Sequence, residues 1–340
     1  MKYLAFIGSN SIRDSRGIYS VSISADGIGT VLSAAPAYNS GALAFSADRK
    51  MLYAVSEGMS FHGRASGGVL AFDICGCELK EHNWQYSGGQ RPCCIGLSEN
   101  GKELYVSNFF GGSISVFPLL EDGSIGEMRA HIKEQPLPGR LDGMHCVEAI
   151  SETEFGAVYL GTGSMILYDA ASCTEIQRFS LAGGAFPRHF ITSPDGNLLY
   201  LLLQTPAEVH VARRNSSGIF EVKQIVPATT PDLAGIAEAS TLKLTPNARV
   251  LIAASRVTNT LAVYRVDESG LLTQTQLMDL PVKTPRDLCI TPDGKFLLVA
   301  GQATDNICIC AIDSHKAELQ VTSILEGVTS PGSIVIKEDT

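Results

Sequence analysis

The sequence predicts an all-β protein assembled from about seven copies of one four-stranded unit. The clearest copy lies at residues 185–205. There, a short apolar run at 190–193 is followed by the turn Pro194-Asp195-Gly196 and a second apolar run at 198–203. Two apolar runs joined by such a turn are typical of a β-hairpin. A hairpin returns the chain to where it began, so residues before its first strand and after its second lie at the same end of the sheet.

The hairpin recurs along the chain, and its turns give the period. The turn glycines Gly101, Gly196 and Gly294 are two units apart, so one unit has about 48 residues, in the range of β-propeller blades. A chain of 340 residues then holds about seven units. The other hairpins are expected at 42–57, 94–108, 146–161, 241–256 and 287–302, of which 146–161 has lost the turn chemistry.

A third strand follows each hairpin, and a more variable fourth run leads into the next unit. The third strands are expected at 68–74, 113–117, 165–169, 208–212, 261–266 and 307–312.

The two ends of the chain fit a closed ring. The N-terminus reads as a second strand at 3–8 and a third strand at 17–23, without a first strand, and the C-terminal segment 331–337 has the pattern of the missing one. Joining the two would close the ring and remove its exposed edges. We therefore predict one domain over residues 1–340, a seven-bladed β-propeller with four-stranded antiparallel blades. A six-bladed ring would leave a unit unexplained, and an open solenoid would leave an edge uncovered.

Composition narrows the function classes. A content of 45% hydrophobic residues is enough for a large core, but no apolar run approaches the roughly 20 residues of a membrane span. A net charge of −9 without a basic stripe argues against nucleic-acid binding. The N-terminus lacks the features of a secretory signal, and the nine cysteines have no disulfide or zinc spacing. We expect a cytoplasmic monomer with reduced thiols, no cofactor and no metal.

By the hairpin geometry, polar residues converge at one mouth of the central channel. Those before the first strands are Cys94, His145, Arg188, His189, Thr241 and Arg286, and those after the second strands are Asn10, Glu57, Asn108, Gln204, Arg256 and Gln302. Three unpaired arginines at a narrow mouth repel each other, and arginine grips carboxylate or phosphate in a bidentate manner. A small anion is thus the expected occupant.

A structural role is at least as plausible for any one of these residues, because repeat proteins reuse polar residues at blade junctions. The set, however, follows from the register and points to a site. His189 directly follows Arg188, so alternation along the strand predicts that it points to the opposite face and has a structural role. Glu57, His145 and Asn108 have no spacing that supports a metal site, and the nearby arginines disfavour a cation.

Several segments, taken in order, resemble the seven-bladed lactonase family, which includes propeller-type 6-phosphogluconolactonase and the carboxy-muconate lactonizing enzyme. The resemblance covers nearly the whole chain. Its carriers are at 6–19, 52–57, 91–117 (ArgProCysCys…TyrValSerAsnPhePheGlyGlySerIleSerValPhe), 141–147 (LeuAspGlyMetHisCysVal), 187–196 (ProArgHis…SerProAspGly) and 284–302 (ThrProArgAsp…ThrProAspGlyLys).

The resemblance implies a propeller with an acid–base histidine at His145 and arginines at Arg188, Arg256 and Arg286 that hold an anionic substrate and polarise a lactone. The chain departs from the family's usual residues at four positions. Gln204 replaces Glu, Thr241 replaces Glu or Asp, Cys94 often replaces His, and Phe109 replaces Tyr. Gln204 can still hydrogen-bond a substrate but cannot take a proton.

The leading hypothesis is a hydrolase of a small anionic lactone, such as a sugar-acid lactone. In it, His145 activates water, Arg256 stabilises the oxyanion, Arg188 and Arg286 hold the carboxylate or phosphate, and Glu57 is a second acid or base. Gln204 and Asn108 are expected to contact the substrate. Two alternatives remain at this stage: a cycloisomerase that forms a lactone from an unsaturated diacid, and a non-catalytic binding or scaffold propeller.

Overall fold

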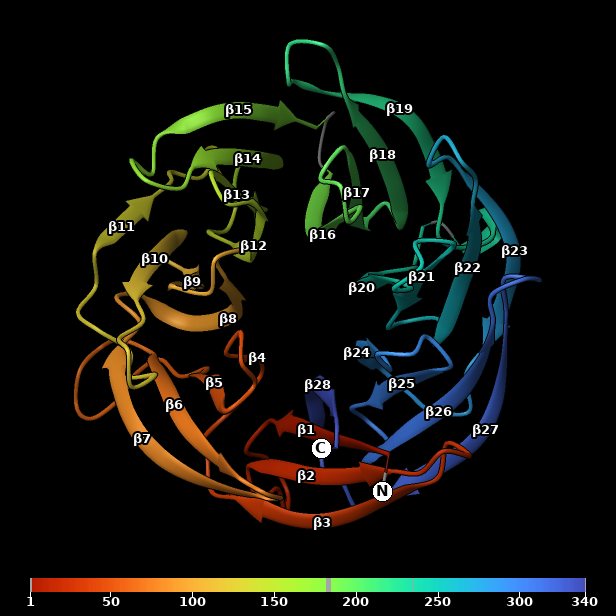
Figure 1. The fold of residues 1–340 in the computed structure, drawn as a ribbon. Helices are drawn as coiled ribbons and strands as arrows, with labels where there is room; N and C mark the ends of the chain where they lie inside the picture. The colour runs from red at the N-terminus through yellow and green to blue at the C-terminus, as the bar shows by residue number, and fades with distance from the viewer. Residues whose placement is uncertain (1, 182–184, 234, 340) are drawn as a thin grey trace.

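The computed structural model describes residues 2–181, 185–233 and 235–339. Seven four-stranded antiparallel sheets stand around a central channel, as Figure 1 shows, and the expected seven-bladed β-propeller is confirmed. Besides the strands there is one short 3₁₀ helix, η1 (Pro231–Leu233), in the described part of the chain. No helix within it is long and apolar enough to cross a membrane.

In six blades the two inner strands are the predicted hairpins, and in the remaining blade they come from the two ends of the chain. The strands that line the channel are β28 (Pro331–Glu338), β4 (Leu43–Phe45), β8 (Gln90–Leu97), β12 (Met144–Ser151), β16 (Phe186–Thr192), β20 (Ala239–Leu244) and β24 (Pro285–Ile290). Their partners are β1 (Tyr3–Ser9), β5 (Met51–Ser56), β9 (Glu103–Phe110), β13 (Glu154–Tyr159), β17 (Leu198–Thr205), β21 (Val250–Ser255) and β25 (Phe296–Gly301).

The third and fourth strands complete each blade outwards. The third strands are β2 (Ile18–Ile23), β6 (Gly68–Cys75), β10 (Ser113–Pro118), β14 (Ser164–Asp169), β18 (Glu208–Arg214), β22 (Thr260–Val266) and β26 (Asn306–Asp313). The outer strands are β3 (Gly29–Ala35), β7 (Glu78–Tyr86), β11 (Ala130–Lys133), β15 (Glu175–Ser180), β19 (Phe220–Pro227), β23 (Leu272–Asp279) and β27 (Glu318–Glu326).

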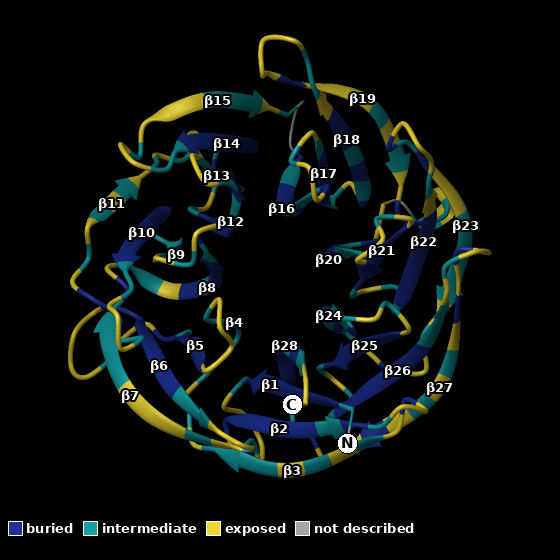
Figure 2. Cartoon of the chain, in the orientation of Figure 1, coloured by how far each residue is buried: buried dark blue, intermediate teal, exposed yellow. Residues whose placement is uncertain are grey.

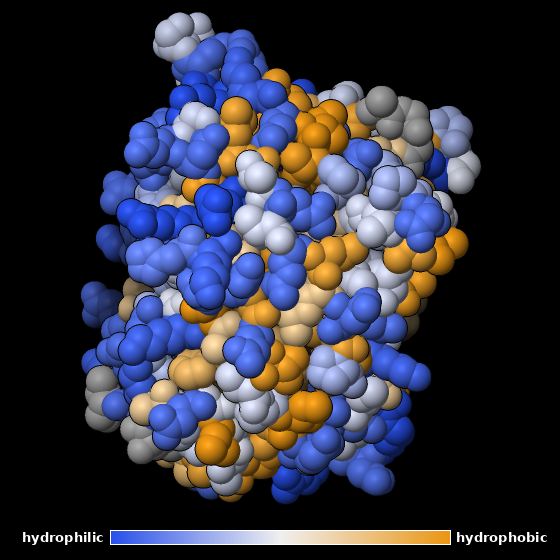
Figure 3. Space-filling view, turned by 90° about the vertical axis from the view of Figure 1, so that its right-hand side faces the viewer, coloured by the Kyte–Doolittle hydropathy of each residue, from blue (hydrophilic) through white to orange (hydrophobic). Residues whose placement is uncertain are grey.

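The burial of each strand follows its place in the blade. The middle strands are covered by neighbouring blades on both faces, so β5 and β21 are buried along their whole length. Each outer strand has a ladder partner on one edge only, and in β27 exposed residues alternate with more buried ones. Figure 2 shows that exposed residues become more frequent from the inner strands to the outer strands. Figure 3 shows an outer face on which apolar and hydrophilic side chains are interspersed.

A repeated amide clamp joins the outer strands of neighbouring blades. The side chain of Gln224 in β19 donates to Leu272 O (2.9 Å) and accepts from Leu272 N (2.8 Å) at the start of β23. Gln177 forms the same pair of bonds with Phe220, and Gln276 forms it with Leu319. Each clamp satisfies a backbone donor and acceptor at a blade junction where no sheet ladder can form.

Ring closure occurs where the sequence predicted it. β28 pairs with β1 in antiparallel register, with Ile7 opposite Ile334 and Ala5 opposite Ile336. Ile334 is 3% exposed and packs in the cluster formed by the first and last blades. The C-terminal strand therefore supplies the channel-lining strand of the N-terminal blade.

This closure can be tested by replacing Ile334 with alanine. The substitution leaves a cavity in a buried cluster, and we expect it to lower the free energy of unfolding by about 2–5 kcal/mol. Urea unfolding followed by circular dichroism measures the loss. The matched control is Ile324→Ala in β27, where the side chain is 41% exposed and the expected loss is below about 1 kcal/mol. Equal losses for the two variants would contradict the closure of the ring by β28.

Candidate functional site

β-Bulges at the same level of the channel-lining strands position the site. In β8, β12, β16 and β20, one extra residue interrupts the pairing with the next strand. The extra residues are Cys93, His145, Arg188 and Ser240. A similar irregularity in β24 falls on Arg286 and Asp287. Because a bulge bends its strand and re-aims a side chain, Cys93, His145, Arg188 and Arg286 line the cavity at the channel mouth. Ser240 is the exception, because it is fully buried and its hydroxyl donates to Pro285 O.

The bulge in β16 overturns the prediction for His189. Strict alternation predicted that His189 points away from Arg188, but both side chains line the same cavity deeper in the channel. The register shifts between Pro187 and His189, so the alternation of side chains is broken at Arg188. His189 Nδ1 lies 3.3 Å from the hydroxyl of Thr241, and its ring lies 5.2 Å from that of His145.

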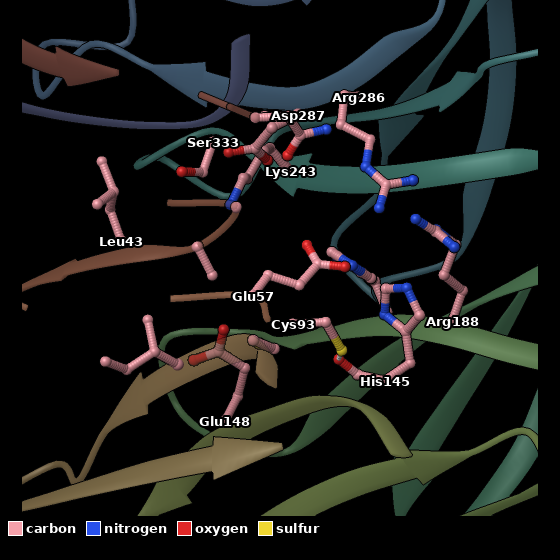
Figure 4. A pocket seen from close by; sticks show the side chains of 17 residues that line it. Leu43, Glu57, Cys93, His145, Glu148, Arg188, Lys243, Arg286, Asp287 and Ser333 are labelled. Atoms are coloured by element: carbon pink, nitrogen blue, oxygen red, sulfur yellow. Dashed lines mark hydrogen bonds between the residues drawn. The ribbon is translucent and has the colours of Figure 1, made fainter. Parts of the chain in front are cut away.

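A cavity of about 380 Å³ at the channel mouth, here called the histidine cavity, contains most of the predicted site residues. Its walls come from six blades and combine charged groups with an apolar side. The lining residues are Glu57, Arg91, Cys93, Phe109, Leu141, His145, Leu160, Phe186, Arg188, Gln204, Arg256 and Arg286. Figure 4 shows Glu57, His145, Arg188 and Arg286 directed toward one another. All three residues predicted as catalytic, and three of the four predicted to bind substrate, line this cavity.

Asn108 is the exception. It is fully buried inside its blade, and its amide nitrogen donates to Ser87 O (3.0 Å) and Ser113 Oγ (3.2 Å). Its position within β9 turns the side chain into the sheet packing rather than the channel. The expectation that Asn108 contacts a substrate is therefore wrong.

His145 lies at the floor of the histidine cavity with a strongly perturbed imidazole. The residue is 4% exposed, and Nδ1 is buried without a hydrogen-bond partner among the described residues. Burial, followed by the positive charge of Arg188, holds the pKa of His145 well below its usual 6.5. The imidazole is therefore neutral near pH 7, the state in which it accepts a proton.

The three arginines differ in how they are held. Arg188 donates from Nη1 to Gln204 Oε1 (2.8 Å) and from Nε to Ser240 O (2.7 Å). Arg256 forms an ion pair with Glu238, with Nε 2.9 Å from Oε2. The expectation of three unpaired arginines is thus wrong for Arg256.

Arg286 alone of the three forms neither a hydrogen bond nor an ion pair within the described part of the chain. Burial lowers its pKa, and the charge of Arg256 lowers it further, whereas Glu57 raises it. The nearby carboxylate of Glu57 bonds to Arg91 instead, with Arg91 Nη2 2.6 Å from Glu57 Oε1. A guanidinium that faces a cavity without its own partner is a ready site for an anion.

Below the histidine cavity, the channel narrows to a space of about 100 Å³ lined by further titratable groups, including Glu148, Lys243 and Asp287 (Figure 4). The donor atoms of Cys94, Cys146 and Glu148 lie within 4.8 Å of one another, as in a metal site. However, the neighbouring Cys94 thiol and burial raise the pKa of Cys146, and burial raises that of Glu148 to about 7.

Sequence reasoning assigned no role to three residues in or beside the histidine cavity. Glu238 lies just before β20, three residues upstream of Thr241, and its place ahead of a channel-lining strand could have identified it. Arg91 and Cys93 flank Pro92 at the start of β8. Cys93 Sγ lies 3.3 Å from His145 O, a contact that no sequence pattern indicates.

Comparisons with known proteins agree with this architecture. Residues 4–336 match the family model described as lactonase, 7-bladed beta-propeller. The chain is 25% identical to the 6-phosphogluconolactonase of Bacillus subtilis over 99% of this chain and 98% of that protein. It is 28% identical to the 6-phosphogluconolactonase of Pectobacterium atrosepticum over 67% of this chain and 69% of that protein.

Solved structures show the same fold. A Bacteroides fragilis protein superposes with a TM-score of 0.88 at 28% identity, covering 99% of this chain and 98% of that one. The periplasmic gluconolactonase of Pseudomonas aeruginosa superposes with a TM-score of 0.91 at 24% identity, covering 99% of each chain. The ring of seven blades and the match over nearly the entire sequence lead to one conclusion: the chain belongs to the seven-bladed β-propeller lactonase family.

Proposed function

We propose that this protein hydrolyses a small anionic lactone of the sugar-acid type. The observation that carries the proposal is the meeting of a neutral, buried histidine with three arginines in one cavity. Relatives named 6-phosphogluconolactonase support the same substrate class, which makes 6-phosphogluconolactone the first substrate to test, with gluconolactone as its uncharged counterpart.

The reaction begins with His145 as a general base. Its neutral imidazole takes a proton from water, and the hydroxide equivalent attacks the lactone carbonyl to give a tetrahedral oxyanion. Collapse of this intermediate breaks the bond to the ring oxygen, which leaves as an alkoxide and takes the proton back from His145. The product is an open-chain hydroxy acid, which loses its carboxyl proton to solvent near pH 7.

Arg188 is the group best suited to stabilise the oxyanion. Among the charged groups near His145 it has the largest effect on the pKa of the imidazole, and its bonds to Gln204 and Ser240 fix its orientation. A preorganised cation needs no rearrangement as negative charge develops in the transition state. The oxyanion role that the sequence assigned to Arg256 thus passes to Arg188.

Arg286 then holds the substrate's carboxylate or phosphate, because its guanidinium has no competing partner. Arg256 adds positive charge from the rim, where Glu238 holds it in place. Glu57, fixed by Arg91, is directed toward the same space and positions Arg286 through its charge. Gln204 lines the cavity and holds Arg188 in place by a hydrogen bond. Because an amide cannot take a proton, Gln204 positions Arg188 and does not act as an acid or base.

The two alternatives receive less support. Forming a lactone from an unsaturated diacid requires an acid that donates a proton to carbon, and the lowered pKa of His145 disfavours the protonated imidazole. A scaffold role predicts a histidine enclosed by packing, whereas His145 lines a cavity together with Arg188, Arg256 and Arg286.

A cytoplasmic location is part of the proposal, and the state of the cysteines supports it. All nine cysteines are free, although the thiols of Cys308 and Cys310 lie only 3.8 Å apart. Disulfides are rare in reducing compartments. Cell fractionation of the native host with an antibody to the chain tests this location directly.

Replacing His145 with alanine should reduce kcat for the hydrolysed lactone about 10²- to 10⁴-fold, the usual contribution of a general base. Acid release in a pH-stat, corrected for spontaneous hydrolysis, measures the loss on gluconolactone and 6-phosphogluconolactone. The matched control is His315→Ala at an exposed turn, which should keep wild-type turnover. Turnover by a folded His145→Ala variant at the wild-type rate would remove His145 from the mechanism.

The pH profile provides a second prediction. Because the pKa of His145 is depressed, the active neutral form persists below pH 6.5, and kcat/KM should stay level through pH 6.5 and fall only in more acidic buffer. Arg188→Met removes a positive charge that disfavours the imidazolium, so the pKa of His145 rises and the acidic fall moves to higher pH. Steady-state kinetics across the acid range measure both effects.

Arg188→Lys is the control for this profile, because it keeps the charge and should keep the position of the acidic fall even where kcat declines. A wild-type profile that falls near pH 6.5, or one that Arg188→Met leaves in place, would contradict the assignment of His145 as the base.

A further inference from the structure

A second cavity of about 580 Å³ adjoins the histidine cavity, and it has no part in the mechanism above. The two share Glu57, Arg91 and Arg286, so this trio forms a narrow waist between them. The second cavity extends from the waist toward the first and last blades and is here called the outer lobe. Its wall includes Asn10, Ile12, Tyr38, Met59 and Gln302.

Large apolar side chains gather in the outer lobe although they are open to solvent. Ile12 is 47% exposed, Tyr38 is 58% exposed and Met59 is 51% exposed. Single exposed apolar residues are ordinary on a protein surface, but three around one hollow indicate a ligand-binding groove. Tyr38 is an aromatic surface against which the apolar face of a ring can pack.

Amide side chains supply the polar contacts of the lobe. The side chains of Asn10 and Gln302 form no hydrogen bond with another described residue, and both line the hollow. An amide both donates and accepts, which matches a hydroxyl group, whereas it gives no advantage to a charged group. The charged pair at the waist, Glu57 and Arg91, is already neutralised by its own ion pair.

The walls of the outer lobe are fixed by hydrogen bonds between the loops that carry them. Asn39 accepts a bond from Ser11 N (2.7 Å) through its side chain, and Asn39 N donates to Ser11 Oγ (2.9 Å). The loop of Met59 is tied to β8, with Gln90 Nε2 donating to Met59 O (2.9 Å) and Arg91 N to Gly58 O (2.9 Å). The lobe is therefore largely formed before a ligand arrives, as is usual for small-molecule sites.

We propose that the outer lobe is a subsite for an uncharged sugar ring attached to the lactone. The substrate is then a lactone whose anionic group lies on Arg286 and whose sugar-acid ring carries a second, uncharged sugar. Its lactone ring lies over His145, and the second ring packs on Tyr38 with its hydroxyls on Asn10 and Gln302. A lactone with one ring fills the histidine cavity alone and leaves this prepared surface uncovered. The inference rests on the proposed function, since it names the substrate class of the same site.

The test compares one-ring and two-ring lactones that both lack an anionic group, so that the second ring is the difference between them. The ratio of kcat/KM for lactobionolactone to that for gluconolactone is measured by acid release in the wild type. We expect this ratio to be about 10 or more, the scale on which a well-made extra contact discriminates between substrates. Tyr38→Ala should bring the ratio close to 1, and Tyr38→Phe, which keeps the aromatic face, should preserve it.

Leu141→Ala is the matched control. Leu141 is 75% exposed and lines the histidine cavity but not the outer lobe, so its loss should affect both substrates alike and leave the ratio unchanged. Thermal unfolding of each variant verifies the fold. Calorimetric binding of lactobionate and gluconate, the two hydrolysis products, gives a readout that does not depend on turnover.

The outcomes separate the two proposals. Hydrolysis of gluconolactone or 6-phosphogluconolactone with a ratio at or below 1 overturns the outer-lobe subsite and leaves the lactonase function intact. Absence of any lactone hydrolysis, together with Tyr38-dependent preference for lactobionate over gluconate, overturns the lactonase function and supports the subsite. Equal binding of the two acids without hydrolysis overturns both.

Discussion

The bulges in the channel-lining strands are the constraint on which the site depends. A regular strand would alternate its side chains between two blade faces, and residues from different blades would not converge. The extra residue in β8, β12, β16 and β20 breaks that alternation at the mouth end of the channel. Three of the residues used in the proposed mechanism, His145, Arg188 and Arg286, come from these irregular positions.

Contacts between neighbouring bulges hold this belt together. Cys93 Sγ lies 3.3 Å from His145 O, Arg188 Nε donates to Ser240 O, and Ser240 Oγ donates to Pro285 O (2.6 Å). Each bulge frees backbone groups from the sheet ladder, and the next blade satisfies some of them. The site thus depends on neighbouring blades as well as on each blade's own bulge, because Arg188 bonds both to Gln204 of its own blade and to Ser240 of the next.

Much of the fold could be predicted from sequence, because the hairpin turns repeat at a constant spacing and the terminal strands are complementary. For the site, the sequence predicted which residues lie near the channel mouth but not how their side chains are oriented or paired. Period-two alternation failed at His189 because a bulge has no sequence signal comparable to Pro-Asp-Gly in a turn. Asn108 failed because it is paired with Ser113 and Pro92 in the ladder, whereas Gln204 stands at a register shift, and repeat spacing does not show which residue near a strand end stays paired. The Arg256–Glu238 pair depends on side-chain conformation, which spacing does not determine.

The electrostatics of the site explain why a protein of net charge −9 concentrates cations at one point. Burial of Arg188 and Arg286 near His145 is unfavourable for the folded state, and the lowered pKa values of all three express that cost. The same cost favours function, because an anionic lactone brings the charge that the site lacks. Negative charge developing at the carbonyl then meets a cation that is already in place. The many buried contacts of the remaining blades offset this local destabilisation, so the folded ring is stable. The electrostatic repulsion among the buried cations is relieved when an anionic substrate binds.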